Sequence, residues 1–206
     1  MDAGQPPRKR DGAATREAIL AAAVVEFTEH GYARAGVRQI AERAGVTAMM
    51  INRYFGSKDR LFAQAVDRAF EPPTVVGDER RELSQALAHT LAERTGPGAE
   101  RLDPFLLMLR SVPDPEATDA LRQGIETHVG ARLAGLLPEP GAEVRAQLGL
   151  ALVAGVWLLR TVVGTTALAE AADDDLAELL TAMLQPLTAE AGDGAAPDAG
   201  AENPDD

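Results

Sequence analysis

The sequence predicts an all-α fold with about nine helices, and three observations lead to that prediction. Apolar residues recur at three- and four-residue spacing in successive segments, which is the period of an amphipathic helix. Glycine or proline separates these segments, as expected at helix boundaries. Period-2 alternation and Asn-Gly turns, the signals of strands and hairpins, are missing. With 46% hydrophobic and 4% aromatic residues, the composition indicates a globular core of Ala, Leu and Val.

The N-terminus predicts a flexible basic arm followed by a helix. Residues 1–12 are polar, rich in Pro and Gly, and carry the run Arg-Lys-Arg at residues 8–10. We expect Thr15 to be the N-cap of the first helix and Gly31 to end it. Its apolar face is formed by Ile19, Leu20, Ala23, Val24 and Phe27.

Three helices of the N-terminal region follow this first one. Residues 37–44 form a short helix, and Thr47 caps the next, which runs to about Phe55. Gly45 separates these two helices. Ser57 then caps a fourth helix, whose apolar stripe is Leu61, Phe62, Ala65 and Val66.

The rest of the chain predicts more helices and a tail. The expected helices cover residues 79–94, the segment from Pro104 to the next proline, and residues 116–136, 143–168 and 174–190. The helix at 143–168 is apolar nearly all round, so one of its faces needs a cover outside its own domain. Residues 191–206 are Gly, Ala, Pro and acid, which predicts disorder.

Charge divides the chain in the same way as these elements. Residues 1–70 carry 11 basic and 8 acidic side chains (+3), and residues 71–206 carry 9 basic and 24 acidic ones (−15), which together give −12. The basic N-terminal region can bind a polyanion, whereas the acidic remainder of the chain, the body, would repel one. The alternative is that both halves are solvated surfaces. The predicted parts are an arm (1–12), a first helical domain (13–70), a second helical domain (71–190) and a tail (191–206).

Composition argues against several functional classes. The chain has no Cys, which excludes disulfides, thiolate catalysis and Cys-ligated metal. Its three histidines, His30, His89 and His128, are too scattered for a metal site, and residues 173–175 (Asp-Asp-Asp) suit a helix N-terminus better than a metal. A Ser-His-acid string and a phosphate-cradling glycine loop are missing as well. We therefore expect no enzyme activity, no metal and no cofactor.

Hydropathy predicts a cytoplasmic protein without a membrane span. No apolar segment follows the start of the chain, so a signal peptide is not expected. The most apolar run is Leu148–Leu159, which Arg160 interrupts. A membrane-spanning helix needs about 20 apolar residues, more than this run offers.

The motif with the clearest functional meaning lies at residues 31–58, GYARAGVRQIAERAGVTAMMINRYFGSK. Two short helices joined by a tight turn form a helix-turn-helix pattern, whose second helix enters the major groove of DNA. Gly45 suits the left-handed backbone of the turn, and Val46 and Ile51 supply apolar anchors. The second helix, capped by Thr47, directs its positive dipole end toward phosphate.

On these residues the chain resembles the TetR family of bacterial transcriptional regulators, over about residues 13–66. The resemblance rests on Phe27, Gly31 and Tyr32; Val37-Arg38-Gln39-Ile40-Ala41; Ala44-Gly45-Val46-Thr47; and Tyr54-Phe55-Gly56-Ser57-Lys58 with Leu61. A helix-turn-helix alone is a weak signal, but the first helix before it and the Phe-x-Ser-Lys-x-x-Leu string after it make this one specific. The resemblance implies an N-terminal three-helix helix-turn-helix DNA-binding domain and a C-terminal helical ligand-binding and dimerisation domain.

The resemblance also implies which residues contact DNA. Lys58 matches a phosphate contact of the family, and Arg38 matches a position that meets a base or a phosphate. The residues expected at DNA are Arg38, Thr47, Ala48, Met49, Asn52, Tyr54 and Lys58. Two alternatives stay open: Arg38 as an exposed residue in surface ion pairs, and Tyr54 as a packing residue.

The chain departs from the family pattern at two places. Gly36 stands where a Ser or Thr usually caps the second helix. Residues 49–52, Met-Met-Ile-Asn, replace the common Gly-Thr-Leu-Tyr, whose Tyr usually touches phosphate. Asn52 can instead read an adenine edge, and Met49 can pack on a thymine methyl. The operator sequence therefore cannot be inferred from that of a relative.

The resemblance further implies a homodimeric repressor controlled by a small molecule. The helices at about 143–168 and 174–190 would pair with their copies, and two recognition helices about 34 Å apart imply a pseudo-palindromic DNA operator. An unknown effector would bind a cavity of the body. The candidate lining residues are Phe105, Met108, Leu109 and Trp157, for which plain core is the alternative. A second function stays open: a helical small-molecule-binding protein or enzyme whose helix-turn-helix does not bind specific DNA.

Overall fold

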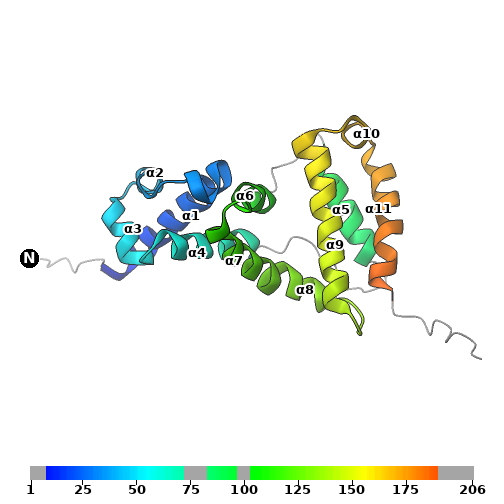
Figure 1. The fold of residues 1–206 in the computed structure, drawn as a ribbon, viewed down its shortest axis with the longest axis horizontal. Coiled ribbons are helices and arrows are strands. Elements are labelled where there is room, and N and C mark those ends of the chain that lie inside the picture. The colour runs from blue at the N-terminus through cyan, green and yellow to red at the C-terminus, as the bar shows by residue number, and fades with distance from the viewer. Residues whose placement is uncertain (1–7, 72–82, 97–102, 190–206) are drawn as a thin grey trace, which may run out of the picture.

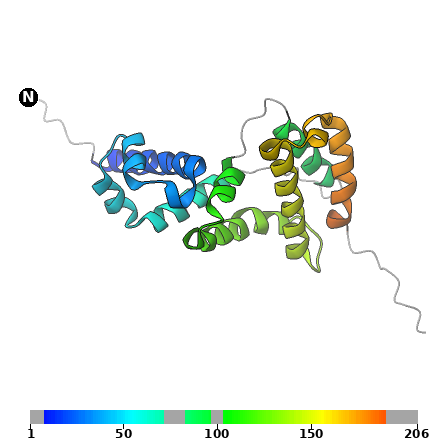
Figure 2. The same cartoon turned by 45° about the horizontal axis from the view of Figure 1, so that its top comes forward.

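The computed structural model describes residues 8–71, 83–96 and 103–189. Within these ranges the chain forms helices and connecting turns and no strand, which confirms the all-α prediction. Figure 1 shows α1–α4 at one end of an elongated molecule and α5, α9, α10 and α11 at the other, with α6–α8 between them. Figure 2 shows the same separation from a second direction.

Four helices make up the N-terminal end: α1 (Arg8–Arg34), α2 (Val37–Arg43), α3 (Ala48–Phe55) and α4 (Lys58–Phe70). The bounds of α2, α3 and α4 confirm the three predicted helices after the first. Ser57 caps α4 as predicted, because its hydroxyl accepts a hydrogen bond from the Arg60 N–H at 3.2 Å. Gly45 has a φ of 67°, which confirms the left-handed turn between α2 and α3.

The first helix begins earlier than the sequence predicts. α1 starts at Arg8, so Thr15 lies inside the helix, and residues 8–12 of the predicted flexible arm are helical. The reason is local: residues 8–14 contain no proline and mostly good helix formers, so the helix extends N-terminally past Thr15. Residues 1–7 of the arm lie outside the described residues.

The C-terminal part of α1 breaks at Gly31, where the sequence predicts the helix end. Gly31 has φ 72° and ψ 170°, which are not helical values. Arg110 of α6 caps the helix before this break, because its Nη1 donates to the carbonyls of Thr28 at 2.8 Å and Glu29 at 2.7 Å. A Cβ at Gly31 would overlap the Arg110 carbonyl, so glycine lets the two backbones touch.

The body contains the remaining elements. They are α5 (Leu83–Thr95), α6 (Asp103–Ser111), α7 (Pro115–Gly124), a π-helical segment (Ile125–Gly130), α8 (Ala131–Ala134), α9 (Ala142–Trp157), a second π-helical segment (Leu158–Val163), α10 (Thr166–Ala169) and α11 (Asp173–Thr188). The predicted start of a helix at residue 79 and the predicted tail at 191–206 lie outside the described residues.

The most apolar helix is shorter than predicted. The sequence predicts one helix over 143–168, but the helix that begins with α9 ends at Val163. Gly164 takes a left-handed φ of 69°, and the N–H of Thr165 closes the helix end on the Leu159 carbonyl at 2.9 Å. The apolar pattern hides this end, because it continues through the separate short helix α10.

The largest apolar core joins the N-terminal helices to part of the body. Its buried members from α1–α4 include Ile19, Phe27, Ile40, Ile51 and Phe62, and its members from α6 and α7 include Leu107 and Leu121. A smaller core joins α5, α9 and α11 through Leu91, Val156, Leu180 and Leu184. By packing, α6 and α7 therefore go with the helix-turn-helix, although they follow residue 70 in the chain.

A continuous helical run from α7 through α8 lies beside α4 (Figure 1). The two run in the same direction, since Gly124 meets Val66 and, further along both, Arg132 meets Glu71. A Cβ at Gly124 would overlap the Val66 side chain, so the approach is close. Arg132 donates to the Glu71 carbonyl at the end of α4 at 3.3 Å. We call residues 115–134 the α7–α8 run.

Candidate nucleic-acid interface and ligand pocket

Backbone hydrogen bonds hold α2 and α3 in a helix-turn-helix. The N–H of Gly45 donates to the Glu42 carbonyl at 3.1 Å, and the N–H of Val46 donates to the Ala41 carbonyl at 2.9 Å. Ile51 of α3 is buried in the largest core. The turn and this anchor fix the direction in which α3 presents its outer face.

The outer face of α3 does not pack against other residues that the structure describes. Ile51 and Phe55, four residues apart, point into the core. Met49 and Asn52 lie on the opposite side, and Met49 exposes 79% of its surface. Figures 1 and 2 place α3 at the end of the molecule away from α9–α11, where a duplex can reach it. An exposed thioether and an exposed amide at this spacing can contact thymine methyls and adenine edges.

Thr47 holds the N-cap position of α3, but its side chain makes no capping hydrogen bond, which corrects the expectation that it caps. Its backbone carbonyl instead accepts from the Met50 N–H at 2.9 Å. The first N–H groups of a helix have no intrahelical acceptors. The exposed Thr47 hydroxyl and these N–H groups can therefore bind a phosphate oxygen together.

The N-cap of α2 also lacks a side-chain hydrogen bond, since it is Gly36. The side-chain amide of Gln39 fills the space that a Cβ at Gly36 would occupy. The side chain of this third helical residue thus folds back over the helix start, where a Ser or Thr side chain would otherwise lie.

The other predicted DNA contacts have three different environments. Arg38 is exposed on α2. Tyr54 is half-buried near the end of α3. Its hydroxyl lies 3.5 Å from the point where a Cβ on Gly12 of α1 would lie. Lys58 is half-buried at the start of α4, and its Nζ lies 4.5 Å from the centroid of the Tyr32 ring. All seven predicted residues thus lie on or beside α2, α3 and the start of α4, and their contacts with DNA stay predictions.

Unpaired cations surround these residues. Arg38, Arg53 and Arg60 are exposed, and none of them forms a salt bridge with another described residue. Arg43, by contrast, is bound by two glutamates of α1. Arg53 and Arg60 are not among the seven residues predicted at DNA. The signal for Arg53 is its position next to a groove-facing residue, and the signal for Arg60 is its place in the first turn of α4.

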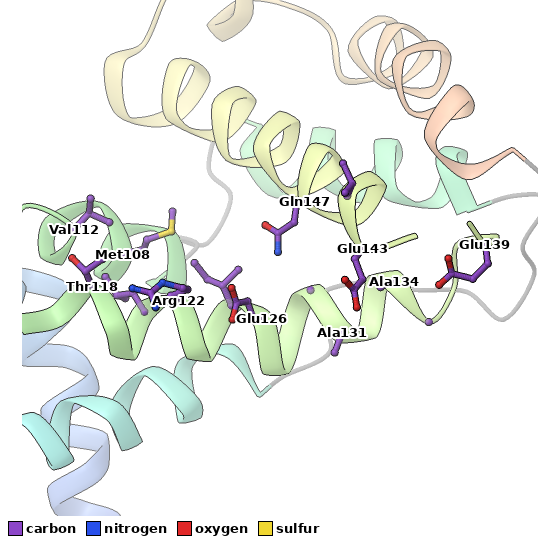
Figure 3. Close-up of a pocket in the computed structure, with 15 residues that line it drawn as sticks. Met108, Val112, Thr118, Arg122, Glu126, Ala131, Ala134, Glu139, Glu143 and Gln147 are labelled. Atoms are coloured by element: carbon purple, nitrogen blue, oxygen red, sulfur yellow. The ribbon is translucent and has the colours of Figure 1, made fainter. Parts of the chain in front are cut away.

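A pocket of about 1060 Å³ lies between α6, the α7–α8 run and α9 (Figure 3). This volume is at the upper end of small-molecule sites, which span about 300–1,000 Å³. The apolar lining includes Met108, Leu121 and Ile125, and the charged lining is Arg122, Glu126, Glu139 and Glu143. Arg122 is paired with Asp119 outside the pocket, whereas none of the three glutamates has a salt bridge within the described ranges. The uncompensated charge of the pocket is therefore negative.

One of the four predicted ligand residues lines this pocket. Among the described side chains, Met108 belongs to the lining, whereas Phe105, Leu109 and Trp157 do not. Phe105 and Trp157 stack on each other instead, with ring centroids 5.5 Å apart, and Trp157 is buried. The lining residues of α7 gave no apolar signal in the sequence, because two of the three, Thr118 and Arg122, are polar or charged. The role of all four residues stays a prediction.

One group of side chains has the spacing of metal ligands: Glu26, Glu29 and His30 on α1. Arg43 of α2 already binds both carboxylates, at 3.3 Å to Glu26 and 2.7 Å to Glu29. We therefore assign the group to an ionic link between α1 and α2.

Two family models match successive parts of the chain. The family described as "Bacterial regulatory proteins, tetR family" matches residues 19–65, which cover the helix-turn-helix. The family described as "Tetracyclin repressor-like, C-terminal domain" matches residues 81–187, more than half of the chain. Together they account for both the N-terminal end and the body.

Individual relatives agree with these models. The HTH-type transcriptional repressor SCO4008 of Streptomyces coelicolor is 41% identical over 59 residues, which are 29% of this chain and 31% of that protein. The HTH-type transcriptional regulator BetI of Stenotrophomonas maltophilia is 26% identical over 170 residues, which are 77% of this chain and 87% of that protein. The solved structure of the multidrug binding protein EbrR complexed with ethidium shares the fold, with a TM-score of 0.60 and 23% identity over 84% of this chain and 98% of that one. The chain is thus a DNA-binding transcriptional regulator and not an enzyme, and it belongs to the TetR family of bacterial regulatory proteins.

Proposed function

We propose that this regulator is a homodimeric repressor that binds a pseudo-palindromic operator through α3 and leaves it when a small molecule occupies the body. The exposed face of α3, with Met49 and Asn52 clear of the core, carries this proposal. Ala48, Met49 and Asn52 would face the bases, while Arg38, Thr47, Tyr54 and Lys58 would hold the phosphates. We add the unpaired Arg53 and Arg60 to the phosphate contacts.

An apolar face on α9 and α11 that is exposed among the described residues supports the homodimer. Its exposed members are Val144, Leu148, Leu159, Val162 and Val163 on α9 and the π-helical segment after it, and Leu179 and Met183 on α11. Figure 1 shows these two long helices at the same end of the molecule. Large exposed apolar residues gathered on two helices in this way are typical of a protein interface. A second copy fits it best, because a two-fold interface also sets two α3 helices at a fixed distance.

The same face could be taken for a lipid-facing surface. The stretch Ala142–Val163 is long and apolar enough to cross a membrane by length and composition. Arg160 lies within this stretch, however, and its side chain is only 1% exposed and bonded to Asp173. We therefore assign the apolar face to the dimer and not to a bilayer.

The α7–α8 run offers a route from the pocket to the DNA. One of its faces lines the pocket through Leu121, Ile125 and Glu126 (Figure 3), and its other face meets α4 through Gly124 and Arg132. A ligand that prefers a shifted run would therefore shift α4 and with it α3. By linkage, its differential affinity for the two arrangements sets how far operator affinity falls.

The pocket favours a cationic effector with an apolar body. The lining combines three glutamates that form no salt bridge with another described residue and the apolar side chains of Met108, Leu121 and Ile125. The body as a whole is acidic. EbrR, which shares this fold, was solved with ethidium, a planar organic cation. We propose the same chemical class here and use ethidium as the first probe.

The test begins with selection of duplexes from a random-sequence library by the purified full-length protein. We expect enrichment of a two-fold related sequence whose half-sites lie about one helical turn apart, and binding that weakens steeply with salt. Asn52→Ala should change the preferred base at one position of each half-site. Asp174→Asn, a neutralised acid on α11, is the control. If no sequence is enriched, the helix-turn-helix does not read DNA and the small-molecule-binding alternative takes over.

A further inference from the structure

Tyr32 lies where the helix-turn-helix end meets the body. Its side chain is buried, and its ring packs edge-on against Phe62 with centroids 4.9 Å apart. Its backbone N–H donates to Ser111 Oγ of α6 at 3.1 Å. The last part of α1 is therefore fastened to the body at this residue.

The Tyr32 hydroxyl lies between carboxylates from two different helices. It donates a hydrogen bond to Asp59 of α4, and Glu116 Oε2 of α7 lies 3.3 Å away. A phenol has one hydrogen, so one of the two carboxylates keeps an uncompensated charge. Burial, followed by the hydrogen bond and charge of Asp59 and the charge of Glu116, raises the pKa of the Tyr32 phenol, so the phenol stays neutral.

Lys58 supplies a cation to this group. Its Nζ lies 4.5 Å from the centroid of the Tyr32 ring, within the range of a cation–π interaction. The ring and the two carboxylates at its hydroxyl edge both attract the ammonium. The same ammonium is our proposed phosphate ligand, so the protein's carboxylates and the DNA compete for it.

We propose that Tyr32 is a positioning residue through which Glu116 of the body weakens the contact between Lys58 and DNA phosphate. This inference rests on the proposed DNA-binding role of Lys58. Asp59 follows Lys58 in the sequence and moves with it, whereas Glu116 belongs to α7. The contribution of Glu116 therefore changes when the α7–α8 run shifts against α4, and this run acts on a DNA contact by charge as well as by movement.

The experiment compares Glu116→Gln with Asp119→Asn in the full-length protein. Both variants remove one negative charge from α7, but Asp119 is paired with Arg122 and does not touch Tyr32 in the described structure. The probe is the duplex that the wild-type protein enriches most. We expect Glu116→Gln to bind it about three- to tenfold more tightly than wild type at low salt, and Asp119→Asn to change binding less.

Two backgrounds test whether the effect passes through Tyr32 and Lys58. In Lys58→Met, the effect of Glu116→Gln should fall to the level of Asp119→Asn. Tyr32→Phe keeps the ring beneath Lys58 and removes the hydroxyl that holds Glu116, so the effect should fall there too. Thermal midpoints report on a purely structural role, which would lower stability and DNA affinity together instead of raising affinity alone.

The inference is overturned if the effects of the Glu116 and Lys58 substitutions on DNA affinity are additive. If Glu116→Gln tightens binding no more than Asp119→Asn, or tightens it equally in Lys58→Met, Glu116 does not act on Lys58. In that case wild-type protein still binds its selected duplex, so the proposed function survives. If wild-type protein enriches no duplex, the proposed function fails first and this inference fails with it.

Discussion

The two ends of this molecule are stabilised in different ways. The N-terminal end has one continuous core, in which Phe27, Phe62 and Leu107 from three helices are fully buried. The far end, formed by α5, α9 and α11, has a smaller core and an apolar face that no other described residue covers. Figures 1 and 2 show these ends as separate bodies of helices joined by α6–α8.

A buried arginine holds the far end together. The Arg160 guanidinium donates to the carbonyls of Leu168, Ala92 and Ala171, to Thr95 Oγ1 and to Asp173 Oδ1, at 2.7–3.1 Å. These bonds tie the π-helical segment after α9 to α5, α10 and α11. Apolar packing therefore stabilises the N-terminal end, whereas the far end depends on a buried polar centre and, under our proposal, on a second copy of the chain.

The largest expected effect comes from removing that polar centre. Arg160→Met should lower the free energy of unfolding by about 3 kcal/mol or more, because it leaves a carboxylate and several buried acceptors without their donor. Hydrogen exchange should show the loss in α5 and α11, while amides of α1 and α4 keep their protection. Arg122→Met is the control, since its exposed ion pair with Asp119 contributes about 0–1 kcal/mol. A loss spread evenly over both ends would contradict the comparison.

The second prediction concerns the N-terminal end at Gly31, where the backbones of α1 and α6 are in contact. Gly31 and Gly45 both have left-handed φ angles, 72° and 67°. A Cβ at Gly31 would overlap the Arg110 carbonyl, whereas a Cβ at Gly45 would have nothing within 4 Å. Gly45→Ala should cost about 1–2 kcal/mol from backbone conformation alone. Gly31→Ala should cost more, about 3 kcal/mol, because α1 and α6 must also move apart.

Urea denaturation of the two glycine variants measures this difference. A larger cost at Gly31 than at Gly45 is expected from the backbone of Gly31, with its ψ of 170°, together with the contact between α1 and α6. Equal costs would mean that the helices separate freely at this point and that the continuous core is looser than its packing indicates.

The third effect tests the uncovered face. Leu179→Glu puts a charge on a side chain of α11 that is 65% exposed, so a monomer should tolerate it. A dimer through this face should dissociate, and operator affinity should fall about a hundredfold or more, since the two half-sites no longer bind together. Analytical ultracentrifugation gives the oligomeric state. Val112→Glu, at a 53% exposed site in the turn after α6, should leave both properties unchanged.

Local chemistry in the sequence predicts most of the N-terminal end. Gly45 and Ser57 appear as predicted, because a left-handed turn and a helix cap depend on residues within three positions. The early start of α1 was missed, since Thr15 is a plausible cap only if the preceding residues leave the helix. The end of the apolar helix at Gly164 was missed because the same apolar pattern continues into α10.

The far end and the pocket could not be predicted in the same way. Two acceptors of Arg160, the Ala92 carbonyl and Thr95 Oγ1, lie 68 and 65 residues earlier in the chain, and the residue types alone do not show that they meet this arginine. Trp157 stacks on Phe105 and does not line the pocket described above, which the apolar pattern does not reveal. These features depend on how distant helices pack, which helical periodicity does not specify.

The smallest expected effect returns to the N-terminal end, at the start of α2. Gly36 has the extended backbone of an N-cap, φ −99° and ψ 139°, so serine fits without strain. The Gln39 amide occupies the Cβ position, but it is the flexible end of a long side chain and can rotate away. Gly36→Ser should therefore raise the free energy of unfolding by a few tenths of a kcal/mol, as its hydroxyl accepts from a first-turn N–H. Gly36→Ala displaces Gln39 without supplying an acceptor and should lower stability. The Ser-minus-Ala difference in thermal midpoint isolates the hydroxyl, and a difference of zero would show that Gln39 already caps this helix.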